Sequence, residues 1–152
     1  MKKQLTIMIT CMLFLTLYIS GCEQLFNKSD SVKVNVMVAV FVNAVDENYT
    51  PVNISFTGME VKINLSKNGK DNLSFERLIQ NNLCRVTCTY TLAQGESIEC
   101  LATIPNGFNN YYPINTGNAT LTWKVAQANM DYTGLYNWYP NITIIMMQNS
   151  TK

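Results

Sequence analysis

The sequence predicts an all-β domain built as a two-layered sandwich. From residue 32 onward, short segments rich in β-branched residues are separated by turns that contain Gly, Pro or Asn. Several of these segments alternate apolar and polar residues with the period of two that is typical of a half-buried strand. Little of the chain after residue 31 favours helix, and these observations together indicate a β-sandwich.

The N-terminus has the pattern of a secretory leader. Two lysines precede an apolar run from Leu5 to Ile19 of about 15 residues, shorter than the roughly 20 that span a bilayer. Ile19-Ser20-Gly21-Cys22 then resembles the lipobox of prokaryotic lipoproteins, in which the Cys is acylated and begins the mature chain. The resemblance implies lipidation at Cys22 and anchoring at the extracytoplasmic face of the cell membrane. An uncleaved anchor, or an ordinary signal peptide with a chance Cys, is the alternative.

This reading divides the chain into a signal-peptide helix at 1–21, a tether at 22–31 and one domain at 32–148. The mature part carries nine basic and ten acidic side chains, so it offers no electrostatic surface for nucleic acid. The chain has no His, which removes the commonest acid–base group and a common metal ligand. It also lacks a phosphate-binding loop, a nucleophile motif and a metal-binding spacing. We therefore expect no cofactor, no metal site and no enzymatic activity.

The densest strand signal runs from Lys33 to Val45, where the even-numbered residues form one apolar face. The other face is also apolar at its centre, at Met37, Ala39 and Phe41, which predicts burial on both faces. Thirteen residues is long for one strand, so we expect that the segment can bend and serve both sheets.

The other elements follow from local pattern. Met59–Ser66 alternates most regularly and leads to the turn signal Asn68-Gly69, and a weaker strand or a short irregular segment follows at about 73–79. Residues 123–131 are compatible with a short helix capped by Thr122 or with a strand that continues from Thr120, and we expect a strand that changes into the short helix. Asn141–Gln148 is nearly all apolar, which indicates a central position in its sheet.

Residues 86–92 and 98–104 predict a hairpin with a three-residue loop. The register that brings their apolar faces together places Cys88 directly opposite Cys100, within disulfide range. Cys84 lies about 13 Å further along the strand and stays unpaired. Because disulfides persist outside the cytoplasm, we expect a Cys88–Cys100 bond. Three reduced, buried Cys are the alternative.

An ordered series of motifs covers roughly residues 34–104: a turn at Asp46–Val52, an alternating strand at Met59–Ile63, a strand at Cys84–Thr91, and Gly95 before a last strand. The series resembles the bacterial Ig-like domains of invasin and intimin type, although Tyr49 replaces the usual turn Gly. The resemblance implies an Ig-like β-sandwich with Greek-key strands in a surface protein, commonly a spacer or adhesive module. A transthyretin-like sandwich is the competing fold, and fold alone does not determine function.

Aromatic residues gather near the C-terminus, where residues 108–139 hold eight of the fourteen in the mature chain. Tyr111, Tyr112, Trp138 and Tyr139 are the candidates for a ligand-binding platform, because Tyr and Trp combine a large area with a polar tip. Packing in the core is the alternative use of such residues.

Asn-x-Ser/Thr sequons are also frequent. The 19 Asn and the Ser and Thr of the mature chain give about three by chance, whereas eight occur. They begin at Asn27, Asn48, Asn53, Asn64, Asn72, Asn118, Asn141 and Asn149. N-glycosylation is one explanation. The other is that residues i and i+2 share the polar face of a strand.

We therefore expect a lipid-anchored, extracytoplasmic Ig-like module that binds a surface protein or a carbohydrate, or that acts as a spacer. A structural or assembly accessory subunit of an envelope complex is the alternative. An enzyme is a third and weaker candidate.

Overall fold

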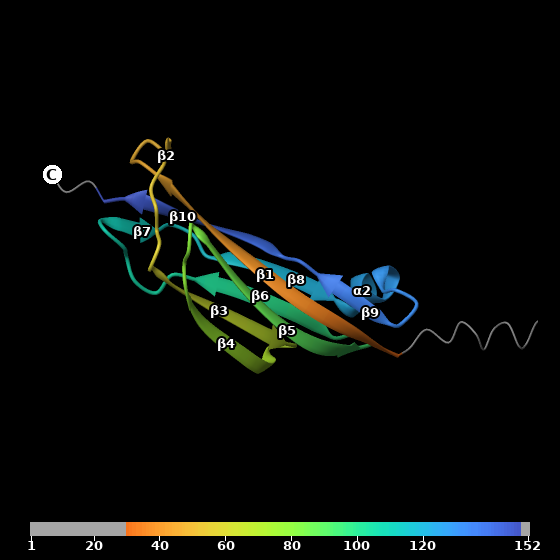
Figure 1. Cartoon of the computed structure of the whole chain (residues 1–152). Helices are drawn as coiled ribbons and strands as arrows, with labels where there is room; N and C mark the ends of the chain where they lie inside the picture. Colours follow the sequence, from red (N-terminus) through yellow and green to blue (C-terminus); the bar gives the residue numbers. More distant parts are fainter. Residues whose placement is uncertain (1–29, 150–152) are drawn as a thin grey trace, which may run out of the picture.

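A computed structural model describes residues 30–149 of the protein, which form two β-sheets packed face to face (Figure 1). The six-stranded sheet contains β1 (Ser31–Val45), β2 (Pro51–Val52), β5 (Leu83–Ala93), β7 (Tyr111–Pro113), β9 (Leu135–Trp138) and β10 (Asn141–Gln148). The four-stranded sheet has the order β4 (Lys70–Leu78), β3 (Glu60–Lys67), β6 (Ser97–Thr103), β8 (Gly117–Thr122).

The predicted all-β sandwich is confirmed. One helix, α2 (Trp123–Asn129), connects β8 to β9 within the described residues. This confirms the predicted change from strand to helix. Thr122 occupies the N-cap position of α2, but its side chain makes no capping hydrogen bond. The predicted leader helix, Cys22 and most of the tether lie outside the described residues. No helix between residues 30 and 149 has the length and apolar character needed to cross a membrane.

β1 organises the six-stranded sheet because it is paired along both of its edges. β5 runs antiparallel to residues 31–41, and β2 continues that edge at residues 44–45. On the other edge, β9 pairs in parallel with residues 33–36, and β10 takes over in parallel at residues 39–45. β1 therefore stays in one sheet and changes partners along its length. The expectation that it bends into both sheets is wrong.

The two faces of β1 have opposite environments. Its even-numbered residues from Val32 to Ala44 are buried in the core between the sheets. On the outer face, the side chains of Met37 and Phe41 are 41% and 38% exposed. The prediction of burial on both faces is wrong, because nothing between residues 30 and 149 covers the outer face. These apolar side chains are part of the surface.

The predicted hairpin of residues 86–92 and 98–104 is also wrong. β5 pairs with β1, whereas β6 pairs with β3 and β8, so the loop between β5 and β6 crosses from one sheet to the other. Their apolar faces meet across the core and not within one sheet. The two strands are therefore not paired, and the expected disulfide is absent, because Cys84, Cys88 and Cys100 are free thiols. Burial, and then the neighbouring Cys88 thiol, raise the pKa of Cys100 to about 12.

The sheets approach each other most closely where β8 passes β10. A Cβ atom on Gly117 would collide with Cγ2 of Ile142, so a residue with a side chain fits there only if β8 or β10 shifts. β10 itself lies between β1 and β7, which confirms the prediction of a central position.

Candidate functional site

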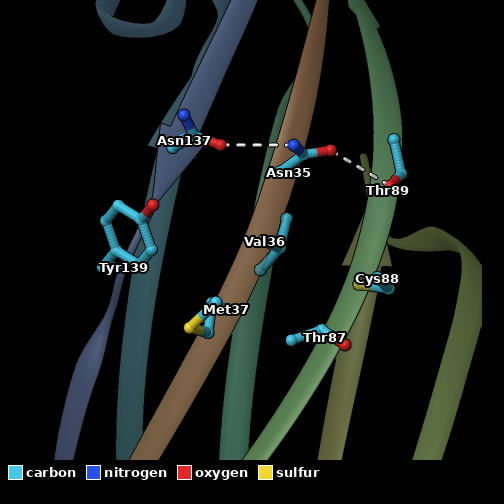
Figure 2. A pocket seen from close by; sticks show the side chains of 8 residues that line it. All are labelled: Asn35, Val36, Met37, Thr87, Cys88, Thr89, Asn137 and Tyr139. Atoms are coloured by element: carbon cyan, nitrogen blue, oxygen red, sulfur yellow. Dashed lines mark hydrogen bonds between the residues drawn. The ribbon is translucent and has the colours of Figure 1, made fainter.

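An open groove of about 400 Å³ lies on the outer face of the six-stranded sheet. It crosses β9, β1 and β5 close to the point where β10 replaces β9 along the edge of β1. Asn137 and Tyr139 line one side, Asn35 and Met37 lie in the middle, and residues 87–89 line the other side. Figure 2 shows Asn137, Asn35 and Thr89 on three neighbouring strands, with Tyr139 just beyond the end of β9.

A row of hydrogen-bonded polar side chains crosses the groove. Nδ2 of Asn35 donates to Oδ1 of Asn137 at 3.2 Å, and Oγ1 of Thr89 donates to Oδ1 of Asn35 at 3.2 Å. The row forms because Asn137 and Thr89 are both directly opposite Asn35 in the strand register. Cross-strand neighbours on one face are close enough for such bonds. The mutual contacts orient the three groups and leave the Asn137 amide N–H groups available to a ligand.

Apolar groups lie one step further along the strands. Tyr139 is two residues beyond Asn137 and is 59% exposed, and Met37 is two residues beyond Asn35 and is 41% exposed. Figure 2 shows both side chains on the same side of the polar row. The groove thus combines amide and hydroxyl groups with an exposed aromatic ring and a thioether.

No charged side chain lines the groove. The one thiol in its lining, Cys88, points toward the core, and burial raises its pKa, which disfavours the reactive thiolate form. The lining has no carboxylate or imidazole that could act as a general acid or base. Residues 30–149 also contain no group of three or more Asp, Glu, Cys or His side chains able to hold a metal ion. The groove can bind and orient a neutral, hydroxyl-rich molecule, for which fixed amides and an aromatic surface are suited.

A second hollow of about 420 Å³ lies further along the same sheet, between β1, β10 and the segment that follows β2. Asn43, Val45, Ile54 and Ile145 are among its lining residues. No hydrogen bond joins polar side chains across this hollow in the described residues. The groove is therefore the better-organised site.

The four aromatic residues chosen from the sequence do not form one platform. Tyr139 lines the groove, whereas Trp138 is half-buried and faces the core. Tyr111 is buried, with its ring centroid 5.6 Å from that of Phe56. Tyr112 is exposed on β7, where its hydroxyl donates to the sulfur of Met147 at 3.2 Å. β7 pairs with the C-terminal end of β10, so Tyr112 is at the opposite end of that strand from Tyr139.

The sequence analysis did not single out the polar row. Asn35, Asn137 and Thr89 belong to no binding motif that the sequence presents. A usable signal was the presence of Asn and Thr at outward positions of otherwise apolar strands. Their convergence could not be foreseen, because Asn35 and Asn137 are 102 residues apart.

Comparison of the chain with protein-family models, curated proteins and solved structures gave no match.

Proposed function

We propose that the protein is a non-enzymatic, lipid-anchored β-sandwich module of Ig-like type that binds neutral carbohydrate at the extracytoplasmic face of the cell membrane. The observation that carries the proposal is the row Asn137–Asn35–Thr89 beside the exposed ring of Tyr139. Sugar hydroxyls match amide and hydroxyl partners, and the apolar face of a sugar ring packs on an aromatic side chain. An open groove on a sheet suits one segment of a longer chain.

The proposed anchor supports a ligand in the envelope of the same cell. Eight residues separate Cys22 from Ser31, where β1 begins, a reach of at most about 32 Å when fully extended. Asn35 is only four residues into β1, so the groove belongs to the end of the domain that the tether enters. A polysaccharide of the cell's own envelope is the nearest ligand of the required chemistry.

A second candidate is an accessory subunit that holds a protein partner on the same face. Met37, Phe41 and Tyr139 are exposed there, and exposed apolar groups are typical of protein contacts. This candidate differs from the first because a protein partner would also cover Phe41, which does not line the groove.

Titration of the mature protein with fractionated envelope polysaccharide tests the proposal. We expect Tyr139→Ala to weaken binding about tenfold, because the ring loses its stacking contact. Tyr112→Ala is the matched control, since it removes another exposed Tyr from the same sheet and should leave the affinity unchanged. Equal affinities for the wild type and Tyr139→Ala would refute carbohydrate binding in the groove. A loss of binding to a protein partner in Phe41→Ala would favour the accessory subunit.

A further inference from the structure

Within residues 30–149, the asparagines with hydrogen-bonded side chains and the asparagines that begin complete sequons are two sets that do not overlap. Six have side chains that hydrogen-bond within residues 30–149: Asn35, Asn68, Asn82, Asn115, Asn129 and Asn137. None of these six begins a sequon. Six complete sequons lie in the same part of the chain, at Asn48, Asn53, Asn64, Asn72, Asn118 and Asn141. None of their side-chain amides makes a hydrogen bond within the described residues.

Strand geometry explains only part of this separation. Asn64, Asn72, Asn118 and Asn141 lie on strands, where residues i and i+2 share a face. Asn35 and Asn43 also point outward from a strand, however, and neither is followed by Ser or Thr at the second position. Asn48 lies in a turn and Asn53 in a loop, where alternation does not apply. All six complete sequons therefore have free side-chain amides, whether or not they lie on strands, although some asparagines outside sequons, such as Asn43, are free as well.

Exposure divides the six complete sequons further. In five of them both the Asn and the hydroxyl residue two positions later are exposed; the exception begins at Asn64. Asn64 and Ser66 are half-buried on β3, which is paired with β4 on one side and β6 on the other. A large enzyme could reach the five exposed sequons on the surface, but not the sixth in the middle of a sheet.

We propose that Asn48, Asn53, Asn72, Asn118 and Asn141 are acceptor sites for N-linked oligosaccharide. In this reaction Nδ2 of the Asn forms a bond to C1 of the first sugar of a lipid-phosphate-linked oligosaccharide. The bond between C1 and the phosphate oxygen breaks, and the lipid phosphate leaves with the electron pair. The displaced amide proton passes to a basic group of the transferase, and no oxidation or reduction occurs. The inference rests on the extracytoplasmic location in the proposed function.

The same division keeps the binding groove clear. Asn35 and Asn137, which orient each other in the groove, are not sequons, so no oligosaccharide would be attached to them. The modified surface and the binding surface would therefore use different asparagines of the same chain.

Peptide mapping of the full protein purified from its own organism tests the inference, with electron-transfer fragmentation to keep the glycans attached. We expect oligosaccharide masses on the five exposed Asn residues, and bare Asn64, Asn35 and Asn137. Unmodified Asn at all five positions would overturn the inference. The N-terminal peptide in the same digest reports acylation of Cys22. An acylated Cys22 with five bare asparagines would overturn glycosylation alone, whereas a chain that retains its leader would overturn the proposed location as well.

A matched pair of variants at Thr120 sharpens the test, because Thr120 is the exposed hydroxyl residue of the Asn118 sequon. Expressed in the native organism, Thr120→Val should lower the intact mass by one oligosaccharide, whereas Thr120→Ser should retain it. Both substitutions are on the exposed face of β8, and thermal melting verifies that both variants fold. Equal glycan masses at Asn118 in the two variants would overturn the assignment of that site.

Discussion

The outer faces of the two sheets differ in chemistry although both are built from alternating strands. The outward strand positions of the six-stranded sheet carry two charged residues in the described part of the chain, Lys33 and Arg85. The corresponding positions of the four-stranded sheet carry Glu60, Lys62, Glu76 and Glu99.

Under the proposed function, this difference separates a solvated face from a face suited to binding a neutral ligand. Charged side chains keep their hydration and resist coverage by a ligand. Amides, hydroxyls, a thioether and an aromatic ring lose less when water is removed from them. A half-buried strand needs polar residues on its outer face. Whether those residues are charged or neutral decides whether the face is also suited to binding a neutral ligand.

The two outer faces exist only while the sheets remain packed back to back, and at Gly117 that packing leaves no room for a side-chain methyl group. We expect Gly117→Ala to lower the free energy of unfolding by about 3 kcal/mol, because the new methyl group collides with Ile142. Urea denaturation measures the loss. Asn118→Ala, on the outward face of the same strand, should change stability by less than about 0.5 kcal/mol.

A double variant distinguishes the collision with Ile142 from a general sensitivity of β8 to substitution. Combining Gly117→Ala with Ile142→Ala removes the atom that the new methyl group meets. The two effects should then be less than additive by about 1 kcal/mol or more. Strict additivity would show that the contact between β8 and β10 does not limit Gly117.

The next expected effect comes from placing the same charge on each face. Asn137→Asp adds a carboxylate to the neutral groove and removes the amide N–H donors, so polysaccharide affinity should fall about tenfold. Asn64→Asp adds the same charge to the outer face of the four-stranded sheet and should leave the affinity unchanged. Calorimetric titration of both variants with the same polysaccharide fraction measures the difference. An equal loss of affinity in both variants would mean that the added negative charge weakens binding regardless of the face on which it lies.

The smallest expected effect concerns Asp131, in the turn that leads to β9. Oδ1 of Asp131 accepts hydrogen bonds from Oγ1 of Thr133 at 2.6 Å, from the Thr133 amide at 2.8 Å and from the Leu135 amide at 3.1 Å. The side-chain bond from Thr133, followed by the amide of Leu135, lowers the pKa of Asp131 from its ordinary value of 3.8. The pKa of Asp131 is lower in the folded state than in the unfolded state. These hydrogen bonds therefore stabilise the turn fully above the ordinary pKa, and the stabilisation is lost as the pH falls through the folded-state pKa.

Amide hydrogen exchange should therefore show weaker protection of the Leu135 amide at acidic pH, while the amide of Ile63 in the four-stranded sheet changes little. Asp131→Asn should abolish the pH dependence of the protection of the Leu135 amide against exchange, since the substituted side chain does not titrate. Persistence of that dependence in Asp131→Asn would assign it to another group.

Local pattern was sufficient for much of the fold. The inner face of β1, the alternation of β3, the Asn68-Gly69 turn and the change from strand to helix after Thr122 all follow the sequence prediction. Each depends on a side-chain period or on a turn residue, and both are properties of neighbours in the chain. The Asn in that turn, for example, has a φ of 52°, which few other residues adopt readily.

The neighbours of each strand were decided only in three dimensions. An alternation with a period of two shows which side chains of a strand share a face, but it does not show which other strand lies alongside. The apolar faces of β5 and β6 were therefore equally compatible with a hairpin in one sheet and with two strands in opposed sheets. The same limit applies to the outer face of β1 and to the contrast between buried Tyr111 and exposed Tyr112. It applies most of all to the groove, where Asn35 meets Asn137 because β9 pairs with β1 across 102 residues of chain. Backbone hydrogen bonding between distant strands placed these side chains together, and no local pattern encodes that pairing.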